Sequence, residues 1–179
     1  DRFGNLYVLA TDNVIYCIPS CGDDDPEPLV TSGVRHAKVR SLSVTDDYIY
    51  LLGDGGIERY YLSFGADGSP VGVKKHSILS THPVKAGRVD SGGAVVVGFD
   101  NMLYKVDGAG DFTPVLDLGG DIDRRGEPSD LLRVASDDIF VSFTANGVLR
   151  IKRDASGRYD AEDLGVKAGV FCLEKSATQ

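Results

Sequence analysis

Pairs of short apolar stretches joined by Gly-, Asn- and Asp-rich turns recur along this chain. The first pair covers residues 4–18, where alternating and β-branched residues flank Asp12-Asn13, a dipeptide suited to a tight hairpin turn. Related pairs follow at residues 47–57, 92–104 and 138–149. Each pair predicts a β-hairpin, and no apolar pattern with a 3.6-residue period is long enough to predict a helix. The chain is therefore predicted to be all-β.

The spacing of these hairpins indicates a repeat. Flanking strands extend the later hairpins to four antiparallel strands, the unit that forms one blade of a β-propeller. The hairpins recur about every 45 residues, which lies within the range for four-stranded propeller repeats. We therefore predict a single domain, a β-propeller of about four blades. The predicted blades cover residues 1–34, 37–80, 83–119 and 130–165, and residues 119–130 are expected to be a connecting loop.

The end of the chain repeats the opening of the third blade. Val166-Lys167-Ala168-Gly169 matches Val84-Lys85-Ala86-Gly87, where that blade begins its first strand. Residues 166–173 are therefore predicted to supply the first strand of blade one and to close it. Interlocked ends of this kind hide edge strands. The sequence allows closure within one chain, an eight-bladed ring of two chains, or a larger propeller.

The opening hairpin resembles the NHL-type β-propeller repeat. In that family a Gly-Asn-aliphatic-Tyr-Val strand precedes an Asn-bearing turn and an Ile-containing strand, as in Gly4-Asn5-Leu6-Tyr7-Val8 and Asn13-Val14-Ile15. The other units keep the strand pattern only, in a manner similar to WD40 blades. The Gly-His and Trp-Asp pairs of WD40 repeats are missing, and the chain has no Trp. The resemblance implies a propeller fold without choosing between families.

Charge and composition narrow the choice of partners. The formal net charge is −8 and the sequence pI is about 4.8. Because phosphate backbones are bound through Lys and Arg, no nucleic-acid partner is expected. No apolar run approaches the roughly 20 residues that span a bilayer, so no membrane association is expected either.

The cysteine pattern predicts a reducing compartment. Cys17, Cys21 and Cys172 are an odd number with no regular spacing, which makes a poor disulfide framework. A Cys17–Cys21 bridge is an alternative, because Pro19-Ser20 could turn the chain between the two thiols. We expect a cytoplasmic protein.

Candidate binding residues gather on one predicted face. In a propeller, the loops between blades and the turns between second and third strands share a face, and polar residues on rigidly held loops often bind partners. Asp and Asn in such turns also serve the backbone alone. The candidates are Arg35, His36, Asp54, His82, Asn101, Arg124 and Arg125. Arg35 and Arg124 are the expected anchors of a protein interface.

The sequence offers no constellation that predicts catalysis or a cofactor. There is no Gly-x-Ser-x-Gly elbow and no cysteine with a convincing histidine partner. His36, His76 and His82 lie in separate segments, so no metal site is predicted. The tyrosines fall within predicted strands and are expected to pack between blades.

These observations favour a non-catalytic scaffold that binds another protein or another copy of itself within a larger assembly. Two alternatives stay open. A propeller enzyme, such as a metal-dependent lactonase or hydrolase, requires acidic residues with Asn or His converging in the central channel. A carbohydrate-binding propeller requires equivalent pockets repeated around the ring.

Overall fold

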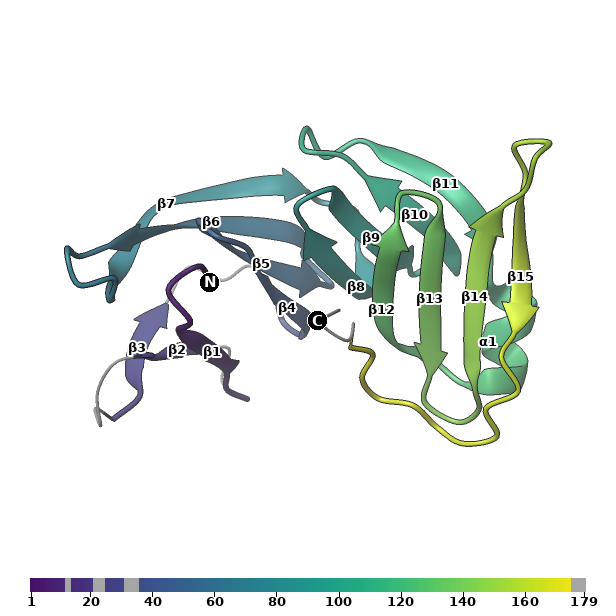
Figure 1. Ribbon diagram of the computed structural model, residues 1–179, viewed down its shortest axis with the longest axis horizontal. Helices are drawn as coiled ribbons and strands as arrows, with labels where there is room; N and C mark the ends of the chain where they lie inside the picture. Colours follow the sequence, from purple (N-terminus) through teal and green to yellow (C-terminus); the bar gives the residue numbers. More distant parts are fainter. Residues whose placement is uncertain (12–13, 21–24, 31–35, 175–179) are drawn as a thin grey trace, which may run out of the picture.

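The computed structural model describes residues 1–179 apart from 12–13, 21–24, 31–35 and 175–179 (Figure 1). It confirms an all-β propeller of four blades, in which blade one has three strands and the others have four. Blade one contains β1 (Leu6–Leu9), β2 (Ile15–Ile18) and β3 (Glu27–Val30). Blade two contains β4 (Val39–Val44), β5 (Tyr48–Gly53), β6 (Gly56–Phe64) and β7 (Pro70–Ser80).

The other two blades follow the same plan. Blade three contains β8 (Val84–Asp90), β9 (Gly93–Gly98), β10 (Met102–Val106) and β11 (Phe112–Asp117). Blade four contains β12 (Pro128–Ala135), β13 (Asp138–Phe143), β14 (Val148–Arg153) and β15 (Tyr159–Asp163). In every sheet, strands that follow one another along the chain pair antiparallel, as the hairpin pattern predicts.

Turn geometry fixes the register of these hairpins. In blade two, Gly53 pairs with Gly56, and Gly56 has a φ of +102°, which residues with a side chain rarely adopt. A Cβ atom at Gly56 would lie 2.1 Å from the carbonyl oxygen of Ser80. The turn and the end of β7 therefore approach each other so closely that only glycine fits.

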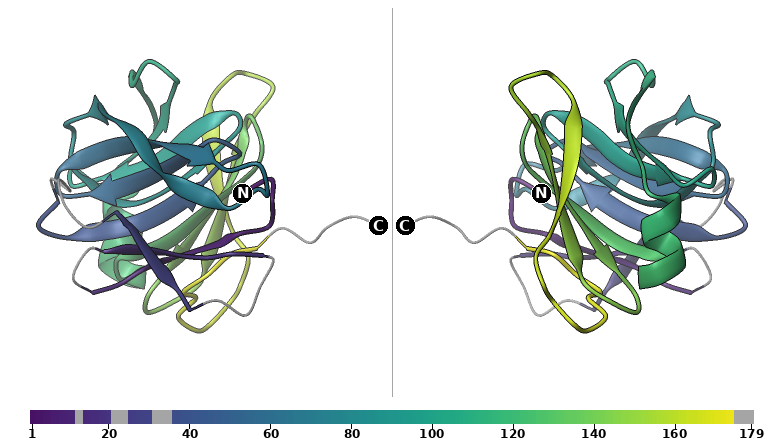
Figure 2. Two further views of the ribbon diagram at one scale, coloured as in Figure 1. Left: turned by 90° about the vertical axis from the view of Figure 1, so that its left-hand side faces the viewer. Right: turned by 90° about the vertical axis from the view of Figure 1, so that its right-hand side faces the viewer.

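Three apolar cores hold the blades together, and each lies between two successive sheets. Figure 2 shows from both ends how the sheets follow one behind another. The core between blades one and two includes Ile15, Ile49 and Leu62. The core between blades two and three includes Leu52, Ile57 and Val96. The core between blades three and four includes Leu103, Ile139 and Phe143. Because burial occurs between sheets, each blade depends on its neighbour for a core.

The inner strands of blades two and three also bind each other through serines. Ser41 and Ser43 on β4 accept hydrogen bonds from the backbone N–H groups of Gly87 and Val89 on β8, at 3.3 and 3.0 Å. These bonds satisfy backbone N–H groups of β8 that point away from β9, the strand with which β8 pairs.

One short helix was not predicted from the sequence. Residues 119–125, expected to be a loop, form α1 (Gly119–Arg125) between blades three and four. Ile122 and the preceding Leu118 are buried in the core between these blades, so tertiary packing stabilises a helix too short to show a periodic pattern. Within the described residues, no helix is long and apolar enough to cross a membrane.

The predicted strand at residues 166–173 is not formed, and this expectation was wrong. The segment is irregular and lies along blade four, where Val170 N–H donates to the carbonyl of Phe143 at 3.0 Å and Gly147 N–H donates to that of Ala168 at 2.9 Å. Strand β1 is consequently an edge strand. Blades one and four lie at opposite ends of the molecule in Figure 1, and the segment stays with blade four.

One polar pair is buried within blade two. The hydroxyl of Tyr60 donates to Oε2 of Glu58 at 2.9 Å, and the side chain of Glu58 is fully buried. Burial, reinforced by the neighbouring carboxylate, raises the pKa of Tyr60 well above its ordinary value.

Truncating the core between blades three and four should be costly. Phe143 is fully buried, so Phe143→Ala should lower the free energy of unfolding by about 3–5 kcal/mol. The control Val71→Ala removes a 67% exposed side chain and should change it by less than about 0.5 kcal/mol. Urea denaturation measures both, and equal effects would contradict the assignment of the core.

Alkaline pH should destabilise the protein through Tyr60. Above about pH 10 the unfolded chain loses the phenolic proton while the folded chain keeps it, so stability falls as pH rises towards the raised folded pKa. Denaturation at about pH 8 and pH 11 should show a larger loss for the wild type than for Tyr60→Phe. Tyr61→Phe, which alters a partly exposed tyrosine, serves as control. Identical pH dependence in wild type and Tyr60→Phe would rule this origin out.

Candidate functional site

The loop-face residues expected to bind a partner are dispersed over three places. Arg35 lies outside the described residues. His36 is buried, and its Nδ1 accepts a hydrogen bond from Gly55 N–H at 3.1 Å. Asp54 accepts the backbone N–H of Lys38 at 3.0 and 3.1 Å. His36 and Asp54 therefore fasten the chain before β4 to the β5–β6 turn.

The second place is the boundary of blades two and three. The His82 ring packs 4.7 Å from the centroid of Phe112 and 5.4 Å from that of Tyr104. Asn101 has a φ of +67° and accepts a hydrogen bond from Lys85 Nζ at 2.8 Å. Both residues thus have packing or turn contacts in this structure.

The third place is helix α1. Arg124 is exposed and donates to Asp121 at 2.7 Å. Arg125 is buried, bonding to Asp121 at 3.3 Å and to Asp163 at 2.8 Å, which ties the helix to β15. Arg124 is the candidate that stays accessible, and its role as an interface anchor stays a prediction.

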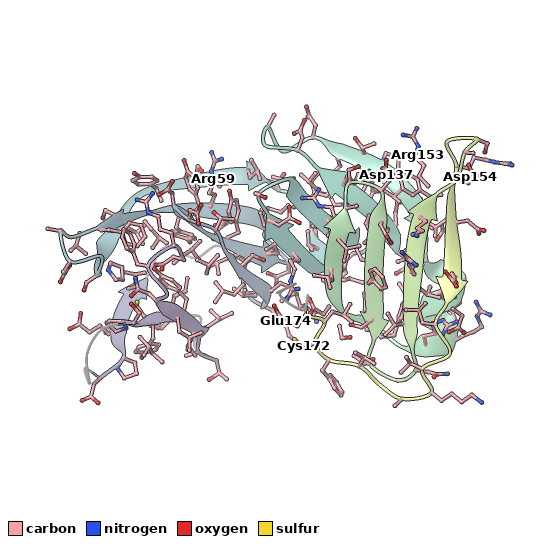
Figure 3. The ribbon with its side chains drawn as sticks, in the orientation of Figure 1. Arg59, Asp137, Arg153, Asp154, Cys172 and Glu174 are labelled. Carbon is pink, nitrogen blue, oxygen red and sulfur yellow. The ribbon has the colours of Figure 1, made fainter. Side chains whose placement is uncertain are left out.

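A cleft lies between blades two and three, outside the three places described above. A cavity of about 380 Å³ there is lined by Tyr50, Leu79, Asp90 and Asp107, among others. A second cavity, of about 110 Å³, is lined by Tyr48, Tyr61 and Ser77. Arg59 lines both cavities, and we call the combined space the Arg59 cleft. Figure 3 shows Arg59 at the same edge as Asp137 and Arg153, with Cys172 at the opposite one.

Strand length creates this cleft. Strands β6 and β7 have 9 and 11 residues, whereas β10 and β11 of the next blade have 5 and 6. Blade two therefore extends past blade three and leaves part of its sheet face uncovered. Tyr50 and Leu79 pack against the core beneath, while Tyr61 stays 38% exposed.

Side-chain contacts hold Arg59 in position. Its guanidinium lies 5.1 Å from the centroid of the Tyr48 ring, and its Nε donates to Ser77 Oγ at 3.3 Å. Tyr48 also meets Tyr61 edge-to-face at 5.4 Å. Over the described part of the chain, no carboxylate lies within ion-pair distance of Arg59. The group is thus oriented by an aromatic ring and a hydroxyl while its charge is uncompensated.

The equivalent positions of blades three and four carry cations that are neutralised. Arg59 pairs across the hairpin with Tyr50, Lys105 with Val95, and Arg150 with Phe140. Lys105 contacts Asp137 and lies 2.6 Å from the Tyr159 hydroxyl. Arg150 binds Asp138 through two nitrogens at 2.9 and 2.7 Å, and this bond holds the pKa of Asp138 below its usual range.

The opposite wall of the cleft is acidic. Asp90 is ion-paired with Arg133, and Asp107 accepts backbone N–H groups from Ala109 and Asp111 at 2.9 and 3.0 Å. These backbone hydrogen bonds lower the pKa of Asp107, and the bond from Asp111 has the largest effect. Each of these two carboxylates already has partners within its own turn or a neighbouring blade.

Sequence reasoning missed this cleft because it assigned the strand tyrosines to packing between blades. That prediction suits Tyr50 and Tyr104, which pack against the core between blades two and three, but Tyr48 and Tyr61 lie beyond the end of that core. The longer predicted span of blade two, residues 37–80 against residues 83–119 for blade three, was the available signal. The partners of the three cations could not be read from the sequence, because they lie on other strands or turns.

Another cavity, the potential metal ligands and the cysteines are weaker candidates for a functional site. A cavity of about 540 Å³ beside β8 and β12 is lined by charges that already have partners, Arg133 with Asp90 and Arg88 with Asp130. Among the described residues, no group of three or more His, Cys, Asp or Glu could hold a metal ion. Cys17 is buried and free, Cys172 is exposed and free, and the alternative Cys17–Cys21 bridge involves Cys21, which lies outside the described residues.

No protein-family model and no curated protein matches this chain, so the NHL-type resemblance stays a prediction. Two solved structures of the BT4673 extracellular domain from B. thetaiotaomicron are similar in fold. One, described as a one-component system, has a TM-score of 0.50 at 15% identity over 87% of this chain and 21% of that one. The other, described as a hybrid two-component system, has a TM-score of 0.52 at 17% identity over 93% of this chain.

These likenesses support the propeller fold, and the chain spans about a fifth of the length of the matched domains, 21% and 22%. They contradict the expected cytoplasmic location, because both matched structures are extracellular domains. The cysteines misled that expectation. Cys17 is unpaired because it packs in the core between blades one and two, a placement that carries no information about the redox compartment.

Proposed function

We propose that this propeller is a non-catalytic recognition module outside the cytoplasm, and that its Arg59 cleft binds an acidic segment of a protein partner. The fold likeness to extracellular domains of signalling systems supports a location outside the cytoplasm and membership of a larger assembly. The cleft supports the binding role, because tyrosine and arginine are the residues that most often dominate protein interfaces.

One observation carries the choice of an acidic partner. Three blades place a cation at the equivalent hairpin position, and only Arg59 has no carboxylate partner among the described residues. A carboxylate from a partner would complete in blade two the ion pair that blades three and four form internally. The stacking on Tyr48 restricts the guanidinium before binding, which lowers the entropy cost of forming that pair.

The tyrosines add apolar contact area beside the charge. Tyr48 and Tyr61 form a wall of the smaller cavity, and Leu79 lines the larger one. An acidic residue flanked by aromatic or aliphatic side chains would therefore fit the cleft better than an acidic stretch alone. Repulsion by Asp107 on the opposite wall also disfavours a uniformly acidic ligand.

A random-peptide library displayed on phage tests this proposal directly. Selection against the immobilised chain should enrich peptides with Asp or Glu next to aromatic or aliphatic residues. Their affinity should fall about tenfold or more with Arg59→Ala, which corresponds to about 1.4 kcal/mol. It should also fall with rising salt, as expected for a partly exposed ion pair.

Arg150→Ala is the matched control, because it removes the equivalent cation of blade four, whose charge Asp138 already compensates. Binding to this variant should equal binding to the wild type. Peptides that bind Arg59→Ala as tightly as the wild type, or a selection that enriches no peptide, would refute the assignment of the cleft.

A further inference from the structure

Blade one exposes a face that is buried in every other blade. Along the second strand of a full blade, alternate residues pack against the preceding blade. Ile49 and Leu51, Ala94 and Val96, and Ile139 and Val141 occupy these positions and are at most 2% exposed. The corresponding residues of β1, Leu6 and Val8, are 59% and 42% exposed.

Among the described residues, blade one also has no strand on its inner side, where the other blades have one. Strands β5, β9 and β13 are each paired with an inner strand, whereas β1 is paired with β2 alone. An apolar strand with one free edge and one free face is a surface shaped for another blade.

The other end of the molecule has the complementary features. Residues 166–169 repeat the sequence that opens inner strand β8. The 166–173 segment contacts β12 through Ser129 and Asp130, and β8 lies beside β4. Serine hydroxyls take part in both contacts: Ser129 on β12 donates to the carbonyl of Val170, whereas Ser41 and Ser43 on β4 accept from the backbone of β8.

Charged groups fix the far end of this segment. Arg88 donates to the carbonyl of Leu173 at 2.9 Å, and Leu173 N–H donates to Asp130 at 2.8 Å. Blade four therefore carries a segment positioned as the inner strand of a following blade, and Phe171 on it is 73% exposed.

We propose that a second copy of this chain joins the two ends. The 166–173 segment of each copy pairs with β1 of the other, and the exposed face of blade one packs against blade four of the other copy. Blades one and four of a single copy lie at opposite ends of the molecule, with blades two and three between them (Figure 1). Two identical contacts related by a twofold axis close the assembly into a ring of about eight blades and leave no free end.

The four-residue repeat predicts the register of the new strand pair. In blade three Arg88 pairs with Val95 and Val89 with Ala94. The equivalent positions place Val170 opposite Tyr7 and Phe171 opposite Leu6. This register brings together two of the most exposed apolar side chains of the chain, Phe171 and Leu6, and buries both on association.

Light scattering after size exclusion tests the association. The chain is expected to show twice its 19.1 kDa mass. The double variant Leu6→Asp with Val8→Asp should show the single mass, and its unchanged circular dichroism should confirm that it is folded. The control Val71→Asp alters a 67% exposed residue outside the proposed contact and should stay dimeric.

Cysteine cross-linking tests the register without destabilising the contact. In a Cys172→Ser background, Leu6→Cys with Phe171→Cys should oxidise to a covalent dimer, and Leu6→Cys alone should give none through this pair. A wild type that stays monomeric at high concentration would overturn the proposal and favour further blades of one polypeptide as the occupant. A disulfide within one chain would overturn it in favour of self-closure.

Discussion

Burial of apolar side chains between successive sheets is the constraint on which this structure depends. No blade has a core of its own: Ile49 and Leu51 of blade two are buried only because blade one covers them, and Val95 and Val97 of blade three only because blade four does. A sheet that uses both faces in this way must have neighbours on both sides. The exposed Leu6 and Val8 mark the place where that requirement is unmet.

Polar contacts adapt this common plan differently in each blade. The hairpin position that holds Arg59, Lys105 and Arg150 lies on the sheet face turned away from the preceding blade. An uncompensated charge on that face is costly where a following blade buries it. Asp137 and Asp138 neutralise the latter two, whereas the longer strands of blade two carry Arg59 beyond the covered region. Strand length and charge compensation are therefore linked: the blade that extends into solvent is the one that can keep a free cation.

The sequence predicted the strands well because their signals are local. Alternating residues and the turns at Asp54-Gly55-Gly56 and Asp100-Asn101 place the hairpins within a few residues of the observed ones. Helix α1 escaped prediction because its stability comes from burying Leu118 and Ile122 against a distant sheet. The 166–173 segment has the composition of a strand, but pairing depends on whether β1 is within reach, which is a property of the whole arrangement.

The candidate site was harder to predict for the same reason. His36 looked like an exposed loop residue, yet Gly55 and Glu58 enclose it, and Tyr61 looked like a core residue, yet blade three ends before reaching it. Whether a polar or aromatic residue is accessible depends on the relative lengths of neighbouring sheets. Residue type and spacing along the chain do not contain that information.

The position of the Arg59 cleft has a mechanical consequence. Because each core joins only adjacent blades, blades two and three are held together by the core and the serine hydrogen bonds at their own boundary. The cleft lies across this boundary, with Tyr61 on blade two and Asp107 on blade three. A molecule bound there contacts both blades at once, so its binding free energy adds to the stability of the boundary between them.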